Sequence, residues 1–92
     1  MTRVGGITEW LDVASLSKCY DIPLCPHVGE MGQVHRHLVA ATPGAFMLEY
    51  IPWIRECFVD PATVENGYYK IPTTPGAGTE MIPEMFTKYR VR

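Results

Sequence analysis

Two residues of this chain stand where catalytic groups are expected, and the first is His27. It follows residues 22–26, a short apolar run typical of a buried parallel strand with Pro23 at its start. Catalytic side chains gather at the carboxyl ends of such strands. An imidazole changes its charge near neutral pH and can transfer protons there. His27 is therefore a candidate acid or base, and the alternative is a histidine that only hydrogen-bonds a loop.

Glu49 is the second candidate, because it holds the matching position in the next apolar run, residues 46–50. A carboxylate within an apolar run is costly to bury unless it has a partner. Burial would favour its protonated form, which can donate a proton or a hydrogen bond. An ion pair with Arg36 or Arg55 explains the residue equally well.

Other histidines and cysteines do not form a recognised metal motif. Cys25 and His27 are two positions apart, as are His35 and His37. Side chains two positions apart on a helix point about 200° away from each other. Structural zinc sites use four ligands in characteristic paired spacings. We therefore expect no metal site within these residues.

The elements that position His27 and Glu49 alternate along the first half of the chain. Residues 8–20 predict an amphipathic helix that Thr8 caps. Apolar residues at 31, 34, 38 and 41 predict a second helix. With strands over 22–26 and 46–50, this order favours parallel β-α units. Two such strands cannot cover a parallel sheet, so we expect neighbours from elsewhere and exposed apolar edges in the isolated chain.

The second half has a different character. Residues 51–92 contain most of the prolines and predict a loop-rich segment. Asn66-Gly67 between residues 63–65 and 68–71 is a strong hairpin signal. Pro83 begins a predicted short helix over residues 83–89.

Composition bounds the partners and the compartment. The 92 residues are 47% hydrophobic and 20% charged, with a net charge of −2. Such a chain is expected to bind neither nucleic acid nor an anionic membrane. No run reaches the roughly 18–20 apolar residues that a membrane span needs, and no secretory signal is evident. Three irregularly spaced cysteines predict no disulfide framework, which favours a reducing, cytoplasmic setting.

Several motifs, in this order and spacing, resemble the C-terminal third of mandelate racemase/muconate lactonizing-type proteins of the enolase superfamily. The resemblance is closest to the mandelate racemase subgroup, which includes many acid-sugar dehydratases. The motifs are Gly5-Gly6-Ile7-Thr8-Glu9-Trp10-Leu11, Ile22-Pro23-Leu24-Cys25-Pro26-His27, His37-Leu38-Val39-Ala40-Ala41, Leu48-Glu49 and Pro75-Gly76-Ala77-Gly78.

The resemblance implies an α/β fold, the C-terminal part of a modified (β/α)7β TIM barrel. Residues 1–50 would form a partial barrel that contains its last two strands and the adjoining helices. Residues 51–92 would be a loop-rich C-terminal segment with a β-hairpin. This segment would return to the capping domain and pack on it and the barrel.

The resemblance also implies a reaction. The family abstracts the proton α to a carboxylate, and Mg²⁺ stabilises the enediolate. His27 matches the acid/base that ends the seventh strand, and Glu49 matches the glutamate that donates a hydrogen bond to the substrate carboxylate. The intact enzyme would dehydrate an acid sugar. The alternative is a racemase or epimerase of a 2-hydroxy acid.

The chain departs from the family pattern in one respect that bears on catalysis. The aspartate that orients the family histidine is missing from Met1–Val4, and the Mg²⁺ ligands of the family lie on earlier strands. We therefore expect a C-terminal fragment that is inactive by itself. Its partner would be the missing N-terminal part of the enzyme, or further copies of the chain. A non-catalytic structural or complementing fragment is the remaining alternative.

Overall fold

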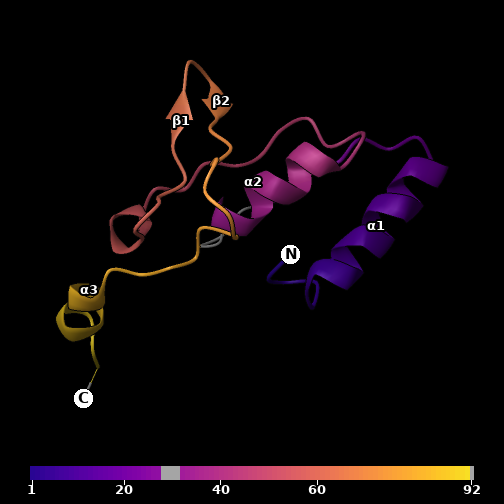
Figure 1. The fold of residues 1–92 in the computed structure, drawn as a ribbon. Helices are drawn as coiled ribbons and strands as arrows, with labels where there is room; N and C mark the ends of the chain where they lie inside the picture. The colour runs from indigo at the N-terminus through magenta and orange to yellow at the C-terminus, as the bar shows by residue number, and fades with distance from the viewer. Residues whose placement is uncertain (28–31, 92) are drawn as a thin grey trace.

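The structure is a computed structural model that describes residues 1–27 and 32–91. Its elements in chain order are α1 (Ile7–Cys19), α2 (Gly32–Ala41), a 3-10 turn η1 (Arg55–Cys57), strands β1 (Val64–Glu65) and β2 (Tyr68–Tyr69), and α3 (Pro83–Lys88). Helices α1 and α2 lie side by side and run in the same direction, the hairpin stands beyond α2, and α3 lies at the far end (Figure 1). The molecule is elongated, with extents of 46 × 32 × 22 Å.

The first helix begins one residue earlier than predicted, and Thr8 does not cap it. Gly6 is the N-cap residue, and no side chain bonds to the free N–H groups of the first turn. Gly5 and Gly6 have φ of 106° and 142°, which only glycine adopts freely. This backbone freedom lets the helix start directly at Ile7, so Thr8 is already helical.

The second helix is confirmed, and Trp10 joins it to the first. The Trp10 ring meets the His35 ring edge-on with centroids 6.0 Å apart, and its Nε1–H donates to Thr42 Oγ1 at 3.3 Å. Within the predicted apolar stripe Val34 is buried, whereas Met31 lies outside the described residues. The buried apolar residues in the described part of the chain are few: Trp10, Ala14, Val34, Cys57, Phe58 and Ala62.

The two predicted strands pair in parallel, but they are much shorter than predicted. Only the bridge between Leu24 and Ala45 has strand geometry. Leu24 N–H donates to the carbonyl of Gly44 at 2.9 Å, and Phe46 N–H donates to that of Leu24 at 3.4 Å. Pro26 has no N–H to continue the ladder toward residues 46–50, which explains why the pairing stops.

The hairpin and the last helix match their predictions. Val64 pairs with Tyr69 and Glu65 pairs with Tyr68. Asn66 and Gly67 both have positive φ, 53° and 84°, as the turn type that joins such short strands requires. Helix α3 begins with Pro83 at its first position. An antiparallel bridge between Phe58 and Met81 ties the end of the chain to the segment after η1.

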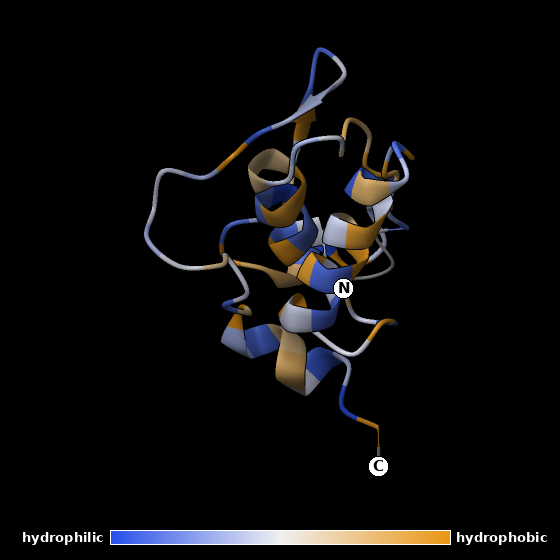
Figure 2. Ribbon diagram, turned by 90° about the vertical axis from the view of Figure 1, so that its right-hand side faces the viewer, coloured by the Kyte–Doolittle hydropathy of each residue, from blue (hydrophilic) through white to orange (hydrophobic). Residues whose placement is uncertain are grey.

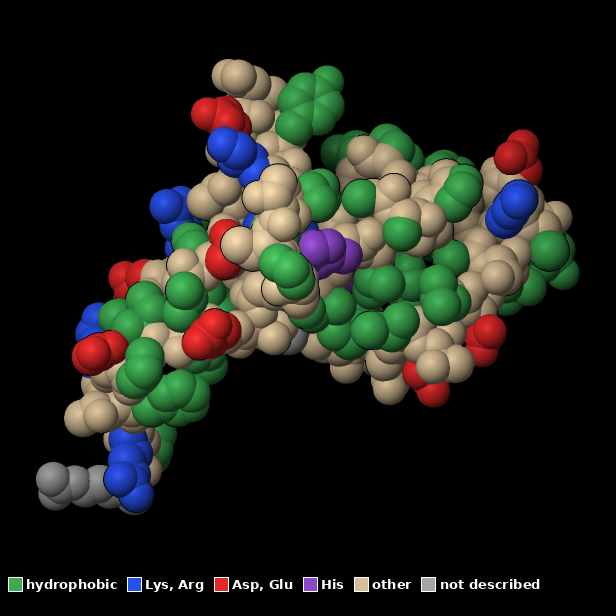
Figure 3. Space-filling view, viewed as in Figure 1, with side chains coloured by type: hydrophobic (Ala, Val, Ile, Leu, Met, Phe, Trp, Pro, Cys, Tyr) green, Lys and Arg blue, Asp and Glu red, His purple; other side chains and the backbone are tan. Residues whose placement is uncertain are grey.

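Apolar side chains cover much of the surface. Hydrophobic and hydrophilic residues alternate around the helices in Figure 2, and Figure 3 shows apolar side chains gathered over α1 and the adjoining part of α2. Ile22, Phe46 and Met47, on the paired segments, are 60%, 65% and 56% exposed. The prediction of exposed apolar edges is therefore confirmed. Within the described ranges, no helix has the length and apolar character to cross a bilayer.

Candidate active site

The two residues predicted to carry chemistry meet directly. Nδ1 of His27 contacts Oε2 of Glu49, although 22 residues separate them in the chain. Each lies at the end of one of the paired parallel segments, so the pairing brings both side chains to the same edge. Both side chains are about half exposed, at 53% and 45%. The site is therefore open to solvent.

An extra residue in the pairing brings Glu49 to this position. Phe46 N–H donates to the carbonyl of Leu24, and Glu49 N–H donates to that of Pro26 at 3.4 Å. Between these two hydrogen bonds, the chain advances three residues from Phe46 to Glu49 but only two from Leu24 to Pro26. A β-bulge has the same excess of one residue on one strand. Such bulges redirect side chains, and here the displaced residue is the glutamate that reaches His27.

The contact between carboxylate and imidazole determines what each group can do. A carboxylate oxygen at Nδ1 accepts a hydrogen bond from Nδ1–H, so it favours the tautomer with its lone pair on Nε2. In this tautomer, Nε2 of His27 carries the lone pair that can accept a proton.

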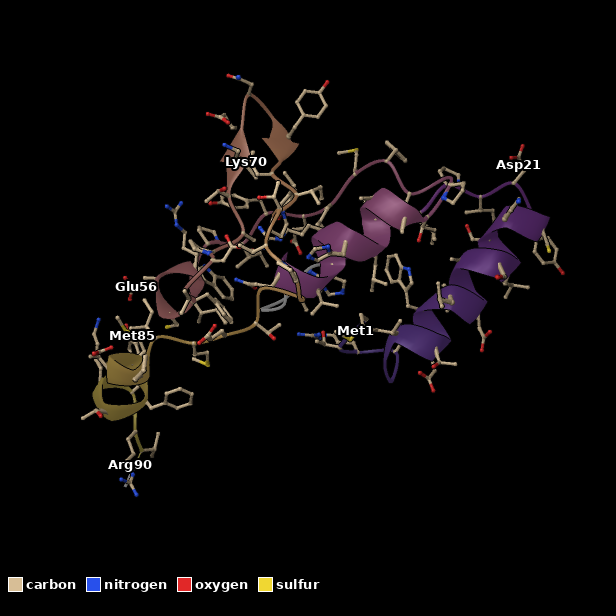
Figure 4. All side chains as sticks on the ribbon, in the orientation of Figure 1. Met1, Asp21, Glu56, Lys70, Met85 and Arg90 are labelled. Carbon is tan, nitrogen blue, oxygen red and sulfur yellow. The ribbon has the colours of Figure 1, made fainter. Side chains whose placement is uncertain are left out.

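The N-terminal residues line a cavity beside His27. The cavity has a volume of about 210 Å³ and lies between Met1–Val4, the first helix and residues 24–27. Met1 lies between the starts of α1 and α2 in Figure 4. Its amino group is 2.6 Å from Nε2 of His35, and partial burial lowers the pKa of this amine. The cavity is lined mainly by apolar side chains, with Thr2, Arg3 and His27 as its polar ones.

Sequence reasoning missed Tyr69 as part of this site. The hydroxyl of Tyr69 donates to the backbone carbonyl of Glu49 at 2.6 Å. Its ring meets that of Tyr50 edge-on, with centroids 5.7 Å apart. Burial raises the pKa of Tyr69 to about 12, with smaller effects from the charges of Tyr50 and Glu49. No local pattern in the sequence links Tyr69 to a carbonyl 20 residues away, so only the hairpin itself was predictable.

The alternative of an ion pair between Glu49 and an arginine is not what the structure shows. Arg36 is buried and donates to the carbonyl of Lys70 at 3.3 Å and to Oδ2 of Asp60 at 3.5 Å. Arg55 donates to the hydroxyl of Tyr50 at 3.1 Å. The Glu49 side chain is nearly half exposed, so the effect of burial considered for it above does not apply in this structure.

A metal ion needs several suitable side chains close together. Across residues 1–27 and 32–91, no three His, Cys, Asp or Glu side chains come together in a way that could hold an ion. Cys19 and Cys25 are exposed thiols, whereas the thiol of Cys57 is buried. Among the described residues, the contact between His27 and Glu49 therefore has no group of metal ligands beside it.

Two curated proteins and one solved structure are similar to nearly the whole chain. L-galactonate dehydratase of Hypocrea jecorina is 35% identical over 95% of this chain, and D-xylonate dehydratase of Haloferax volcanii is 31% identical over 85%. The chain spans about a fifth of the length of both, 21% in each case. An enolase from Bradyrhizobium, crystallised with magnesium and mandelic acid, matches 97% of this chain with a TM-score of 0.83 and 30% identity. The matched region is 24% of that enolase chain.

The family comparison covers almost the same residues. The model of the enolase C-terminal domain-like family matches residues 1–85. That range contains both paired segments, the hairpin and the contact between His27 and Glu49. The chain therefore belongs to the enolase C-terminal domain-like family.

Proposed function

We propose that this chain supplies the His27–Glu49 end of an active site that abstracts the proton α to a carboxylate, in an enzyme that dehydrates an acid sugar. The direct contact between the two side chains, at the ends of paired parallel segments, carries the proposal. Two relatives of the chain are named as dehydratases of acid sugars, which supports the substrate class.

His27 acts as the acid/base in this proposal. Its Nε2 takes the α proton, and its Nδ1–H stays bonded to Glu49, as the contact between them favours. The same imidazolium can then protonate the β-hydroxyl as it departs. The α proton and the hydroxyl leave as water, and the enol that remains becomes a 2-keto acid.

Glu49 has two roles that its position allows. Its carboxylate orients the His27 ring, which in the family pattern is the task of an aspartate. Because the group is half exposed, it is also accessible to a substrate carboxylate when protonated. By orienting the ring, Glu49 keeps His27 in a position to act as a base in this chain.

We include magnesium in the proposal for two reasons. The family resemblance implies it, and the similar enolase was crystallised with it. The described residues of this chain do not fit a magnesium site, because no three suitable side chains come together in them. In line with the family resemblance, we propose that the ligands of the ion lie on parts of the enzyme other than the described residues. His27 and Glu49 act on the substrate and not on the metal.

A chimera tests the proposal. Residues 1–92 would replace the matched region of L-galactonate dehydratase, and formation of a 2-keto acid from acid sugars would be followed with added Mg²⁺. We expect activity that His27→Ala abolishes and Glu49→Gln lowers. His37→Gln, a histidine change on α2 away from the pair, is the matched control and should leave most activity intact. Full activity in the His27→Ala chimera would refute the assigned role.

Racemisation or epimerisation of a 2-hydroxy acid is the second candidate. Mandelic acid, which the similar enolase structure contains, is a 2-hydroxy acid. Both reactions begin with the same proton transfer to His27, and they differ in whether a β-hydroxyl then leaves. One enantiomer of a 2-hydroxy acid in D₂O discriminates them. Loss of optical rotation with deuterium at the α carbon would favour the racemase.

A non-catalytic role as a structural or complementing piece is the third candidate. Its exposed apolar side chains, which a partner could cover, favour it. Analytical ultracentrifugation of the chain alone measures whether copies associate, and co-expression with the upstream part of a relative tests complementation. A folded chimera without any activity would support this candidate over the other two.

A further inference from the structure

The Glu49 backbone is poorly held by the parallel pairing that brings it to His27. Only the Leu24–Ala45 bridge has regular geometry, and the hydrogen bond from Glu49 N–H to Pro26 is long, at 3.4 Å. The extra residue between Phe46 and Glu49 loosens the register further. Contacts from outside the two paired segments therefore matter for the position of the Glu49 backbone.

Tyr69 holds this backbone from the hairpin. Its hydroxyl donates to the Glu49 carbonyl at 2.6 Å, which is a short bond for two neutral groups. The next residue is held as well, because the ring of Tyr50 packs edge-on against that of Tyr69 at an angle of 72°. The Tyr69 side chain thus contacts both the backbone carbonyl of Glu49 and the ring of Tyr50.

The hairpin is built to place Tyr69 and not its neighbour. Residues Tyr68 and Tyr69 form β2 and project to opposite faces, as successive strand residues do. Tyr68 is 78% exposed, whereas Tyr69 is partly buried. The Asn66-Gly67 turn sets this alternation, since a shift of one residue would exchange the two rings.

We propose that Tyr69 is a positioning residue that keeps the Glu49 carboxylate on Nδ1 of His27. The inference rests on the proposed function, because it gives the pair a reason to be held. Without the Tyr69 hydroxyl, the Glu49 carbonyl loses its hydrogen bond to the hairpin, and the Glu49 carboxylate spends less time on the imidazole. The hairpin then contributes to the chemistry although neither of its strands reaches the reacting atoms.

The test is a ¹⁵N NMR measurement of the His27 ring in the full 92-residue chain. The two ring nitrogens differ in chemical shift according to which one carries the proton. Glu49→Gln removes the carboxylate and gives the reference shift for an imidazole without it. We expect Tyr69→Phe to move the His27 signals toward that reference, and Tyr68→Phe, the matched control, to leave them unchanged.

Two results would overturn the proposal. One is a Tyr69→Phe spectrum whose His27 signals coincide with those of the wild type while Glu49→Gln moves them. The other is a Glu49→Gln variant that does not move them, because no contact would then exist to be positioned. Both are distinct from failure of the proposed function, which is read from the activity of the chimera.

Discussion

Replacing Trp10 by alanine should remove the main contact that holds α1 to α2. The Trp10 side chain is only 5% exposed, and it contacts the His35 ring on α2 and the Thr42 hydroxyl directly after that helix. Removing a buried tryptophan costs about 3–5 kcal/mol. The total stability of a domain of this size is on the order of 5–10 kcal/mol. We therefore expect Trp10→Ala to lose a third or more of the free energy of unfolding.

The second tryptophan provides the control. Trp53 is 75% exposed, so Trp53→Ala should change the free energy of unfolding by less than about 0.5 kcal/mol. Urea unfolding followed by circular dichroism at neutral pH measures both variants against the wild type. In a Trp53→Phe background, the fluorescence of Trp10 alone should report a buried indole that becomes exposed on unfolding. Equal stability of Trp10→Ala and Trp53→Ala would refute the assignment of the core to the α1–α2 contact.

Three further perturbations have defined outcomes. Because folding raises the pKa of Tyr69 from 10 to about 12, its stabilising effect is complete below pH 10 and is lost as the pH rises toward 12. Urea titrations across this range should show the stabilities of wild type and Tyr69→Phe converging. Gly67→Ala should destabilise the chain by about 1 kcal/mol, since alanine disfavours the φ of 84° although its Cβ would meet nothing within 4 Å. Gly78→Ala should cost about 1–3 kcal/mol more in the same assay, because its Cβ would lie 2.7 Å from Nη2 of the buried Arg36; equal losses would show that Arg36 moves aside freely.

The elements set by local chemistry were predictable from the sequence. Asn66-Gly67 requires positive φ at both positions, and the hairpin forms around it. Pro83 begins α3 as expected. The start of α1 was wrong by one residue, because the backbone freedom of Gly5 and Gly6 outweighs the capping tendency of Thr8. Local signals of this kind act over a few residues, which is why the errors are also only about one residue long.

The site was predictable in its members but not in its geometry. The strand and helix pattern places His27 and Glu49 at neighbouring strand ends, and they do meet there. Their direct contact depends on an extra residue in the pairing, which no periodicity reveals. The Tyr69 bond to Glu49 joins segments 20 residues apart, so it follows only from the packed hairpin. The shortening of both strands depends on Pro26 and on the scarcity of neighbours among the described residues.

The prolines of the first paired segment also affect how other chains can associate with this one. Leu24 and Pro26 direct their backbone groups to residues 44–49, so the alternate residues Pro23 and Cys25 face the open edge. Proline has no N–H, and an edge that lacks a donor at Pro23 is a poor template for another strand. This edge therefore resists the strand-to-strand stacking that begins aggregation. A partner that covers it must do so mainly through side chains, in spite of the apolar character of the surface.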